Sequence, residues 1–191
     1  MAARYTAAMT QNHPLPLIWL LSDARNDARL EEALCRLPPG SGFVYRHYHL
    51  AERERRARYI ALYDRAKRRG HTVVLAGDEG WCSDGTYGSV RRGDTGLFLA
   101  TAHDAAELGA AARAGADAVF LSPVFATASH PAAPTLGREH FLCLANRSDI
   151  PVIALGGMTA ERARELGWPR WGAIDGLTPD SAEAHTAATT D

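Results

Sequence analysis

Short apolar runs alternate along this chain with longer segments in which apolar residues recur at helical spacing. The apolar runs predict strands at 17–21, 43–46, 72–76, 96–99, 118–121, 152–155 and 172–174, with a weak eighth strand near 86–89. The intervening segments predict helices over 28–36, 51–69, 104–114, 138–147 and 160–166. Because the strands are nearly continuous in apolar residues and alternate with helices, the pattern is typical of a parallel sheet covered by helices.

Residues at the predicted helix ends support these boundaries. Asp104 and Thr159 stand where a side chain can cap the first turn of a helix. Gly70, Gly115 and Gly167 each follow a helical run, as glycines at helix C-termini do. The alternation of strands and helices is therefore consistent with the local signals.

Such a sheet can take two arrangements, a doubly wound open sheet or a closed eight-stranded (β/α)₈ TIM barrel. The number of strands, and the lack of a G-x-G-x-x-G turn after the first strand, favour the α/β barrel. With 191 residues the barrel is shortened, and only 78–84 and 90–95 separate strands near the middle, so one or two outer helices must be reduced. We expect a single domain over 1–191, with flexible tails at 1–14 and 180–191.

Composition narrows the classes of partner. The chain is 46% hydrophobic and 23% charged with a net charge of −1, so it lacks the excess of positive charge that is typical of nucleic-acid-binding proteins. The basic run at 53–70 favours a solvated helix face over an anionic partner. The apolar run at 15–21 is too short to span a membrane, and we expect a cytoplasmic protein. Its three cysteines lack C-x-x-C spacing and indicate buried or idle thiols, without a zinc site or disulfide framework.

Polar residues and glycines gather at the carboxyl ends of the predicted strands, where binding sites form both in doubly wound sheets and in barrels. The candidates are Arg46, Asp78, Thr101, His103, Ser122, Thr127, Ser129, His130, Gly156, Gly157, Asp175 and Gly176. The segment 122–137 is longer and more hydroxylated than a simple strand-to-helix connection requires, so we expect it to line a ligand site.

The sharpest single motif is a glycine pair between a strand and a helix. Gly156 and Gly157 follow the apolar run VIAL and precede the helix that starts near Thr159. Glycines allow backbone N–H groups to approach an anion closely. A tight turn without a ligand would use the same residues, but a second candidate turn, Asp175-Gly176, follows the next strand and favours a phosphate site.

The segments HDAAELGAAARAGADAVFLSPVFATASHP (103–131), PVIALGGMT (151–159) and WGAIDGL (171–177) resemble the thiamine phosphate synthase and thiazole tautomerase (TenI-like) family. The clear likeness covers 103–177. It implies a (β/α)₈ barrel that binds small phosphorylated heterocycles, a thiazole phosphate or thiamine phosphate, and, in the synthase, a pyrimidine pyrophosphate. A homo-oligomer is compatible with the sequence, and neither nucleic acid nor a membrane is expected as a partner.

The resemblance also implies roles for individual residues. Arg46 matches the arginine of the family's Q-x-R-x-K strand, and Thr101 and His103 match its S-x-H element. The family's T-x-T-K loop corresponds to Thr127, Ser129 and His130, and Ser122 precedes that loop. By the same likeness, phosphate would bind at Gly156, Gly157 and the turn of Asp175 and Gly176.

The chain departs from the synthase pattern on the pyrophosphate side. Both family lysines are replaced, by Tyr48 and His130, and the Asn-Asp pair that binds Mg²⁺ is not intact. The carboxylates that could substitute for that pair are Asp78, Glu79, Asp84 and Asp94. Three roles remain open: a synthase using Mg²⁺, a tautomerase with His130 or His103 as the acid–base group, and a barrel that binds the ligand without catalysis. We expect synthase activity to be poor unless another carboxylate pair rebuilds the metal site.

Overall fold

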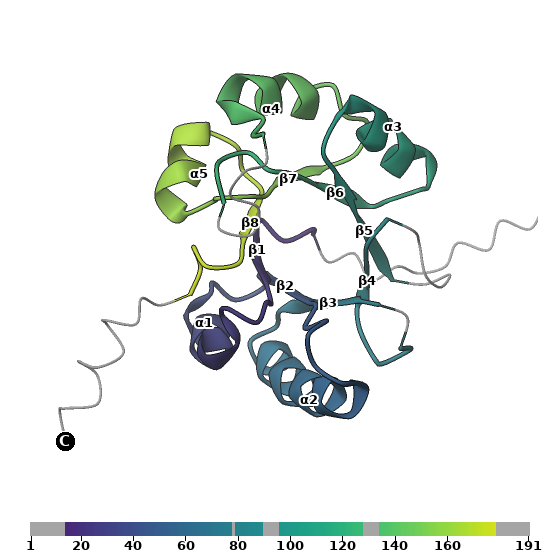
Figure 1. Ribbon diagram of the computed structural model, residues 1–191, viewed down its shortest axis with the longest axis vertical. Coiled ribbons are helices and arrows are strands. Elements are labelled where there is room, and N and C mark those ends of the chain that lie inside the picture. The colour runs from purple at the N-terminus through teal and green to yellow at the C-terminus, as the bar shows by residue number, and fades with distance from the viewer. Residues whose placement is uncertain (1–13, 78, 90–95, 128–133, 179–191) are drawn as a thin grey trace, which may run out of the picture.

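A computed structural model describes residues 14–77, 79–89, 96–127 and 134–178 of the chain (Figure 1). Its strands form a closed barrel in which each strand pairs in parallel with the next and the last pairs with the first. The strands are β1 (Ile18–Leu21), β2 (Gly42–Tyr45), β3 (Thr72–Ala76), β4 (Gly85–Tyr87), β5 (Leu97–Ala102), β6 (Ala118–Leu121), β7 (Val152–Ala154) and β8 (Trp171–Ala173). The barrel is confirmed, and a doubly wound open sheet is excluded.

The helices surround the barrel incompletely. They are the short 3-10 helix η1 (Asp27–Arg29) and the α-helices α1 (Leu30–Arg36), α2 (Glu52–Arg68), α3 (Ala105–Arg113), α4 (Gly137–Ala145) and α5 (Ala160–Leu166). The described residues that connect β3 to β4 and β4 to β5 contain no helix. The prediction of a shortened barrel with reduced outer helices is thereby confirmed. No helix in the described ranges is both long and apolar enough to cross a membrane.

The barrel interior is filled by side chains from alternate strand positions. Its fully buried residues are Trp19, Leu21, Val44, Val74, Leu99, Ala118, Phe120 and Ile153. The rings of Trp19 and Phe120 meet edge to face at 5.9 Å. A Cβ atom at Gly42 would overlap the indole of Trp19, so β2 needs glycine at this position for β1 and β2 to close around the ring.

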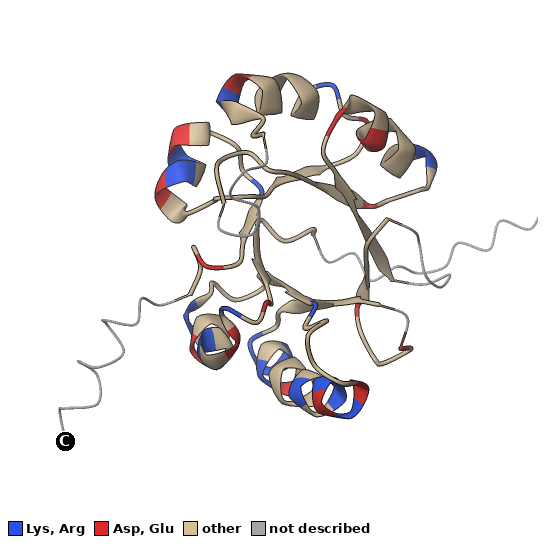
Figure 2. Cartoon of the chain, viewed as in Figure 1, with Lys and Arg blue, Asp and Glu red and all other residues tan. Residues whose placement is uncertain are grey.

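Two further cores lie between the strands and the helices. One packs α1 and α2 against β1 to β3, and the other packs α3, α4 and α5 against β5 to β8. Charged residues lie on the helices and connections, whereas the strands are almost free of them (Figure 2). The basic run at 53–70 forms α2 up to Arg68, and this helix buries Leu62 and Ala66. Half of its six arginines are exposed, as a solvated face predicts, whereas Arg55 is buried.

Capping side chains lie at the helix starts and a glycine at a helix end, as the sequence predicted. The Asp104 carboxylate accepts the Glu107 N–H at 2.9 Å, and the Thr159 hydroxyl accepts the Arg162 N–H at 3.2 Å. Gly167 ends α5 in the left-handed conformation, with φ of 69°. These caps fix where α3 and α5 begin, and hence where the connections that line the barrel mouth end.

Cys35, Cys82 and Cys143 are free and exposed, on helix surfaces and in the connection before β4. Of the two alternatives predicted for them, buried or idle thiols, burial is therefore wrong. The expected flexible tails fall on residues that, apart from Pro14, the structure does not describe. The single domain over 1–191 remains a prediction.

Candidate functional site

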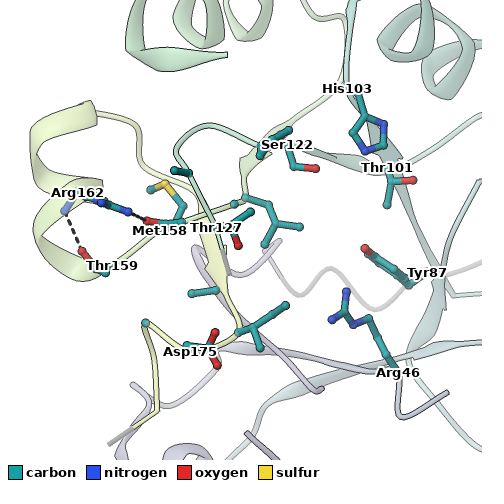
Figure 3. Close-up of a pocket in the computed structure, with 18 of the residues that line it drawn as sticks. Arg46, Tyr87, Thr101, His103, Ser122, Thr127, Met158, Thr159, Arg162 and Asp175 are labelled. Carbon is teal, nitrogen blue, oxygen red and sulfur yellow. Dashed lines mark hydrogen bonds between the residues drawn. The ribbon is translucent and has the colours of Figure 1, made fainter. Parts of the chain in front are cut away.

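A cavity of about 700 Å³ opens at the carboxyl ends of the strands (Figure 3). Nine of the predicted site residues line it: Arg46, Thr101, His103, Ser122, Thr127, Gly156, Gly157, Asp175 and Gly176. They come from five strand ends, which the closed barrel brings together. Thr101 lies within β5 and not after it, because β5 pairs with β6 as far as Ala102. Ser129, His130 and the candidate metal ligands Asp78 and Asp94 lie outside the described residues.

Three connections meet closely at one end of the cavity. Gly156 and Gly157 have φ values of 92° and 62°, a region that glycine adopts without strain. A Cβ atom at Gly156 would lie 2.6 Å from the Cα of Pro123, and one at Gly176 would overlap the carbonyl of Met158. Among the described residues, no acceptor takes the N–H of Gly156, Gly157 or Gly176. This end of the cavity therefore presents backbone donors for which the described ranges of the chain supply no acceptor.

Arg162 adds a positive charge beside these donors. It lies in the first turn of α5, lines the cavity and donates through Nη1 to the Gly157 carbonyl at 2.5 Å. Its guanidinium also lies over the Phe125 ring, 5.2 Å from the centroid. Arg162 was not among the predicted site residues, although its position three residues after the cap Thr159 places it next to the glycine pair.

Asp175 contributes a carboxylate at the same end. Its Oδ2 lies 3.3 Å from Nη1 of Arg25, and its carbonyl accepts the N–H and hydroxyl of Thr178 at 3.0 and 2.7 Å. The turn that places Gly176 is thus held by Thr178, and the ion pair with Arg25 offsets the negative charge of the side chain.

Arg46 occupies another side of the cavity, where Figure 3 shows it near Tyr87. Its Nε donates to the Ser22 carbonyl and its Nη2 to Asp23, both at 3.0 Å. Burial raises the pKa of Tyr87 above its usual 10.0, and the nearby Arg46 guanidinium offsets part of that rise. Tyr87 was missed because the strand that carries it, β4, is short and weakly apolar.

His103 is an exposed histidine on the cavity wall. Its backbone N–H and ring Nδ1 both contact Glu107 Oε2, at 2.7 and 2.9 Å. If Nδ1 carries the proton in that contact, Nε2 is left as a base. The arrangement therefore presents one imidazole nitrogen with acid–base capacity beside Thr101.

The described acidic residues near β3 and β4 do not fit a Mg²⁺ site. Glu79 is ion-paired with the buried Arg55. Asp84 binds Lys67 Nζ at 2.8 Å and accepts the Val73 N–H at 2.7 Å, at the amino end of β4 and away from the cavity. In the part of the chain that the structure describes, no three His, Cys, Asp or Glu side chains group as metal ligands.

Comparisons with known proteins agree with this architecture. Residues 83–168 match the TMP-TENI family model, thiamine monophosphate synthase. The chain is 39% identical over 64 residues to "Putative thiamine-phosphate synthase 2" of Aquifex aeolicus (strain VF5), and that match spans 34% of each protein, about a third of the relative's length.

Solved structures share the barrel. A thiamine phosphate pyrophosphorylase from Pyrococcus furiosus superposes with a TM-score of 0.72 at 19% identity, over 90% of this chain and 92% of that one. An N-acetylmannosamine-6-phosphate 2-epimerase from Clostridium perfringens superposes with a TM-score of 0.54 at 11% identity, over 98% of both chains. At these identities the structures show the fold alone. Residues 83–168 are thus similar to the thiamine monophosphate synthase (TMP-TENI) family, and the described strands form a closed β/α barrel.

Proposed function

We propose that this protein is an enzyme of the thiamine phosphate synthase type that holds a thiazole phosphate in the barrel-mouth cavity. The observation that carries the proposal is the set of N–H groups of Gly156, Gly157 and Gly176 beside Arg162, for which the described part of the chain supplies no acceptor. Gly156 and Gly157 are partly buried, where an unpaired backbone donor is costly, and an anion satisfies several donors at once. The phosphate group would bind at this end of the cavity.

The second substrate would be a pyrimidine pyrophosphate with its anionic group near Arg46. In the synthase reaction the carbon–oxygen bond to pyrophosphate breaks, pyrophosphate leaves with the bonding electrons, and the thiazole nitrogen attacks the resulting cationic carbon. The negative charge on the leaving group must be stabilised. Among the described cavity residues, only Arg46 and Arg162 carry a permanent positive charge, and Arg162 stands at the thiazole phosphate end.

A slow synthase follows from this distribution of charge. Family members use Mg²⁺, and the described carboxylates Glu79 and Asp84 are engaged by Arg55 and Lys67. Asp78 remains our candidate metal ligand. Each missing contact that would stabilise the charge on the departing pyrophosphate costs on the order of a hundredfold in rate. We expect turnover well below the roughly 1 per second of a modest enzyme.

The test supplies purified protein with thiazole phosphate and the pyrimidine pyrophosphate, with and without Mg²⁺, and measures thiamine phosphate formation. Binding of thiazole phosphate is measured in parallel by calorimetry. Binding with slow turnover supports the proposal. Turnover of about 1 per second or faster would restore a fully competent synthase, and absence of thiazole phosphate binding would refute the proposal.

His103 favours a second candidate, a thiazole tautomerase. Moving a proton on a thiazole phosphate carboxylate needs a phosphate anchor and one acid–base group, which the glycine turn and the Nε2 of His103 would supply. Exchange of the substrate proton in D₂O, followed by NMR and lost in His103→Gln, would identify this activity. Thiazole phosphate binding without either reaction would identify a non-catalytic barrel.

A further inference from the structure

A buried histidine joins the two ends of the connection that follows β1. The side chain of His47 has no exposed surface, and its φ of 39° is unusual for a residue other than glycine. Its Nδ1 lies 2.8 Å from Ser22 Oγ, and its Nε2 lies 2.7 Å from Asp27 Oδ1. His47 therefore spans the connection from its first residue to the start of η1.

The same connection holds Arg46. Ser22 Oγ accepts the Arg46 backbone N–H at 2.8 Å, and the Ser22 carbonyl accepts Arg46 Nε at 3.0 Å. Asp23 accepts Arg46 Nη2 at 3.0 Å. The direction of the guanidinium thus depends on the position of residues 22 and 23. Ser22 contacts His47 directly, and the Asp23 N–H is held by Asn26 at 2.8 Å, within the segment that His47 spans.

The hydrogen-bond pattern assigns the protons of the network. Because Ser22 Oγ accepts from Arg46, its own proton is free to go to His47 Nδ1, and the Nε2–H of His47 then donates to Asp27. Burial lowers the pKa of His47 below its usual 6.5, against the opposing effect of Asp27. The neutral ring fits this arrangement.

The far end of the network is anchored to α2. Arg58 donates through Nε to the same Asp27 oxygen at 2.6 Å and also pairs with Glu31. The His49 ring lies 5.0 Å from that of His47. A second hollow, of about 190 Å³, adjoins Ser22, Asp23 and Arg46, so the connection has room to shift when its ties are removed.

We propose that His47 is a positioning residue: through its contacts with Ser22 and Asp27, at the two ends of residues 22–27, it orients Arg46 toward the anionic group of a ligand. His47 does not line the main cavity, so it acts only through these partners. The inference rests on the proposed anion-binding role of Arg46. Outer partners of binding groups commonly contribute about 10-fold to 100-fold in affinity.

The test measures inorganic pyrophosphate affinity by calorimetry at one fixed pH, for wild type, Arg46→Met, His47→Asn and Ser22→Ala. His71→Asn is the matched control, because His71 is equally buried and its Nε2–H donates to the Leu34 carbonyl at 2.9 Å, away from Arg46. We expect His47→Asn and Ser22→Ala each to weaken binding about tenfold. Neither should weaken it further when Arg46 is already methionine.

A second measurement separates positioning from general packing. The Arg46 Nε–H NMR signal, identified by its loss in Arg46→Met, should exchange with water faster in Ser22→Ala and His47→Asn but not in His71→Asn. Should His47→Asn fail to fold, Ser22→Ala decides, because it removes one buried oxygen.

The outcomes are distinguishable. Wild-type affinity in Ser22→Ala and His47→Asn, with weakened binding in Arg46→Met, would overturn the positioning role and leave the proposed function intact. Wild-type affinity in Arg46→Met would remove both the positioning role and the proposed anion-binding role of Arg46. An equal loss in His71→Asn would show general destabilisation and overturn the inference.

Discussion

At the scale of single residues, the cavity depends on side chains that the chain places beside one another only after folding. Arg162 reaches back to the Gly157 carbonyl, and His47 meets Ser22 across 25 positions of sequence. The sequence could predict the glycine pair and Arg46, because each follows a recognisable strand. It could not predict the tie between His47 and Ser22, since that contact depends on the pairing of β1 with β2.

Arg162→Gln tests the positive charge at the phosphate end. We expect inorganic phosphate to bind about tenfold more weakly, because hydrogen bonds to charged groups contribute about 1.5–3 kcal/mol. Arg164→Gln is the matched control, on the same helix but with an exposed side chain that contacts the Ala160 carbonyl. Equal phosphate affinity in Arg162→Gln and wild type, measured by calorimetry, would remove Arg162 from the site.

At the scale of elements, every predicted strand and helix has a counterpart, and the differences lie at the ends. β3, β6 and α5 have the predicted bounds, whereas β5 continues to Ala102 because its pairing with β6 extends that far. The predicted helix over 28–36 begins as the 3-10 helix η1, whose Asp27 is engaged by His47 and Arg58. Periodicity predicts where an element lies, but tertiary contacts decide its last residues.

Gly42→Ala tests how β1 and β2 close around Trp19. The new methyl group would overlap the buried indole, and overpacking of a filled core costs about 1–3 kcal/mol. Gly109→Ala is the control, because Gly109, like Gly42, lacks a positive φ and a Cβ there would meet only the end of the flexible Arg113 side chain. We expect urea denaturation to show a larger loss of unfolding free energy in Gly42→Ala. A loss no larger than in Gly109→Ala would contradict the packing described.

At the scale of the whole molecule, the closed barrel converts scattered polar residues into one cavity, and buried histidines couple its stability to pH. Burial lowers the pKa of both His47 and His71 below 6.5. The unfolded chain then binds protons more readily than the folded one as pH falls below 6.5. The stability is therefore fully present above the unfolded pKa and is lost as the pH falls toward the folded values.

Urea denaturation at pH 7.5 and 5.5 measures this coupling. We expect a lower free energy of unfolding at pH 5.5, and a smaller difference between the two pH values in His71→Asn. His140→Asn, which changes an exposed histidine, should keep the wild-type difference. Stability that is equal or higher at pH 5.5 would contradict the burial of neutral histidines.

The central claim is that the backbone N–H groups of the glycine turn bind phosphate. The most direct measurement compares inorganic phosphate affinity in Gly157→Ala and Gly167→Ala. Both glycines have positive φ, 62° and 69°, but only a Cβ at Gly157 would meet the Ala126 carbonyl, Arg162 and Phe125, whereas Gly167 has open space. We predict that Gly157→Ala binds phosphate at least about tenfold more weakly, since the overlap of its Cβ with the Ala126 carbonyl must displace the turn that presents the N–H groups, and that Gly167→Ala binds like wild type. Wild-type affinity in a folded Gly157→Ala protein would contradict the account.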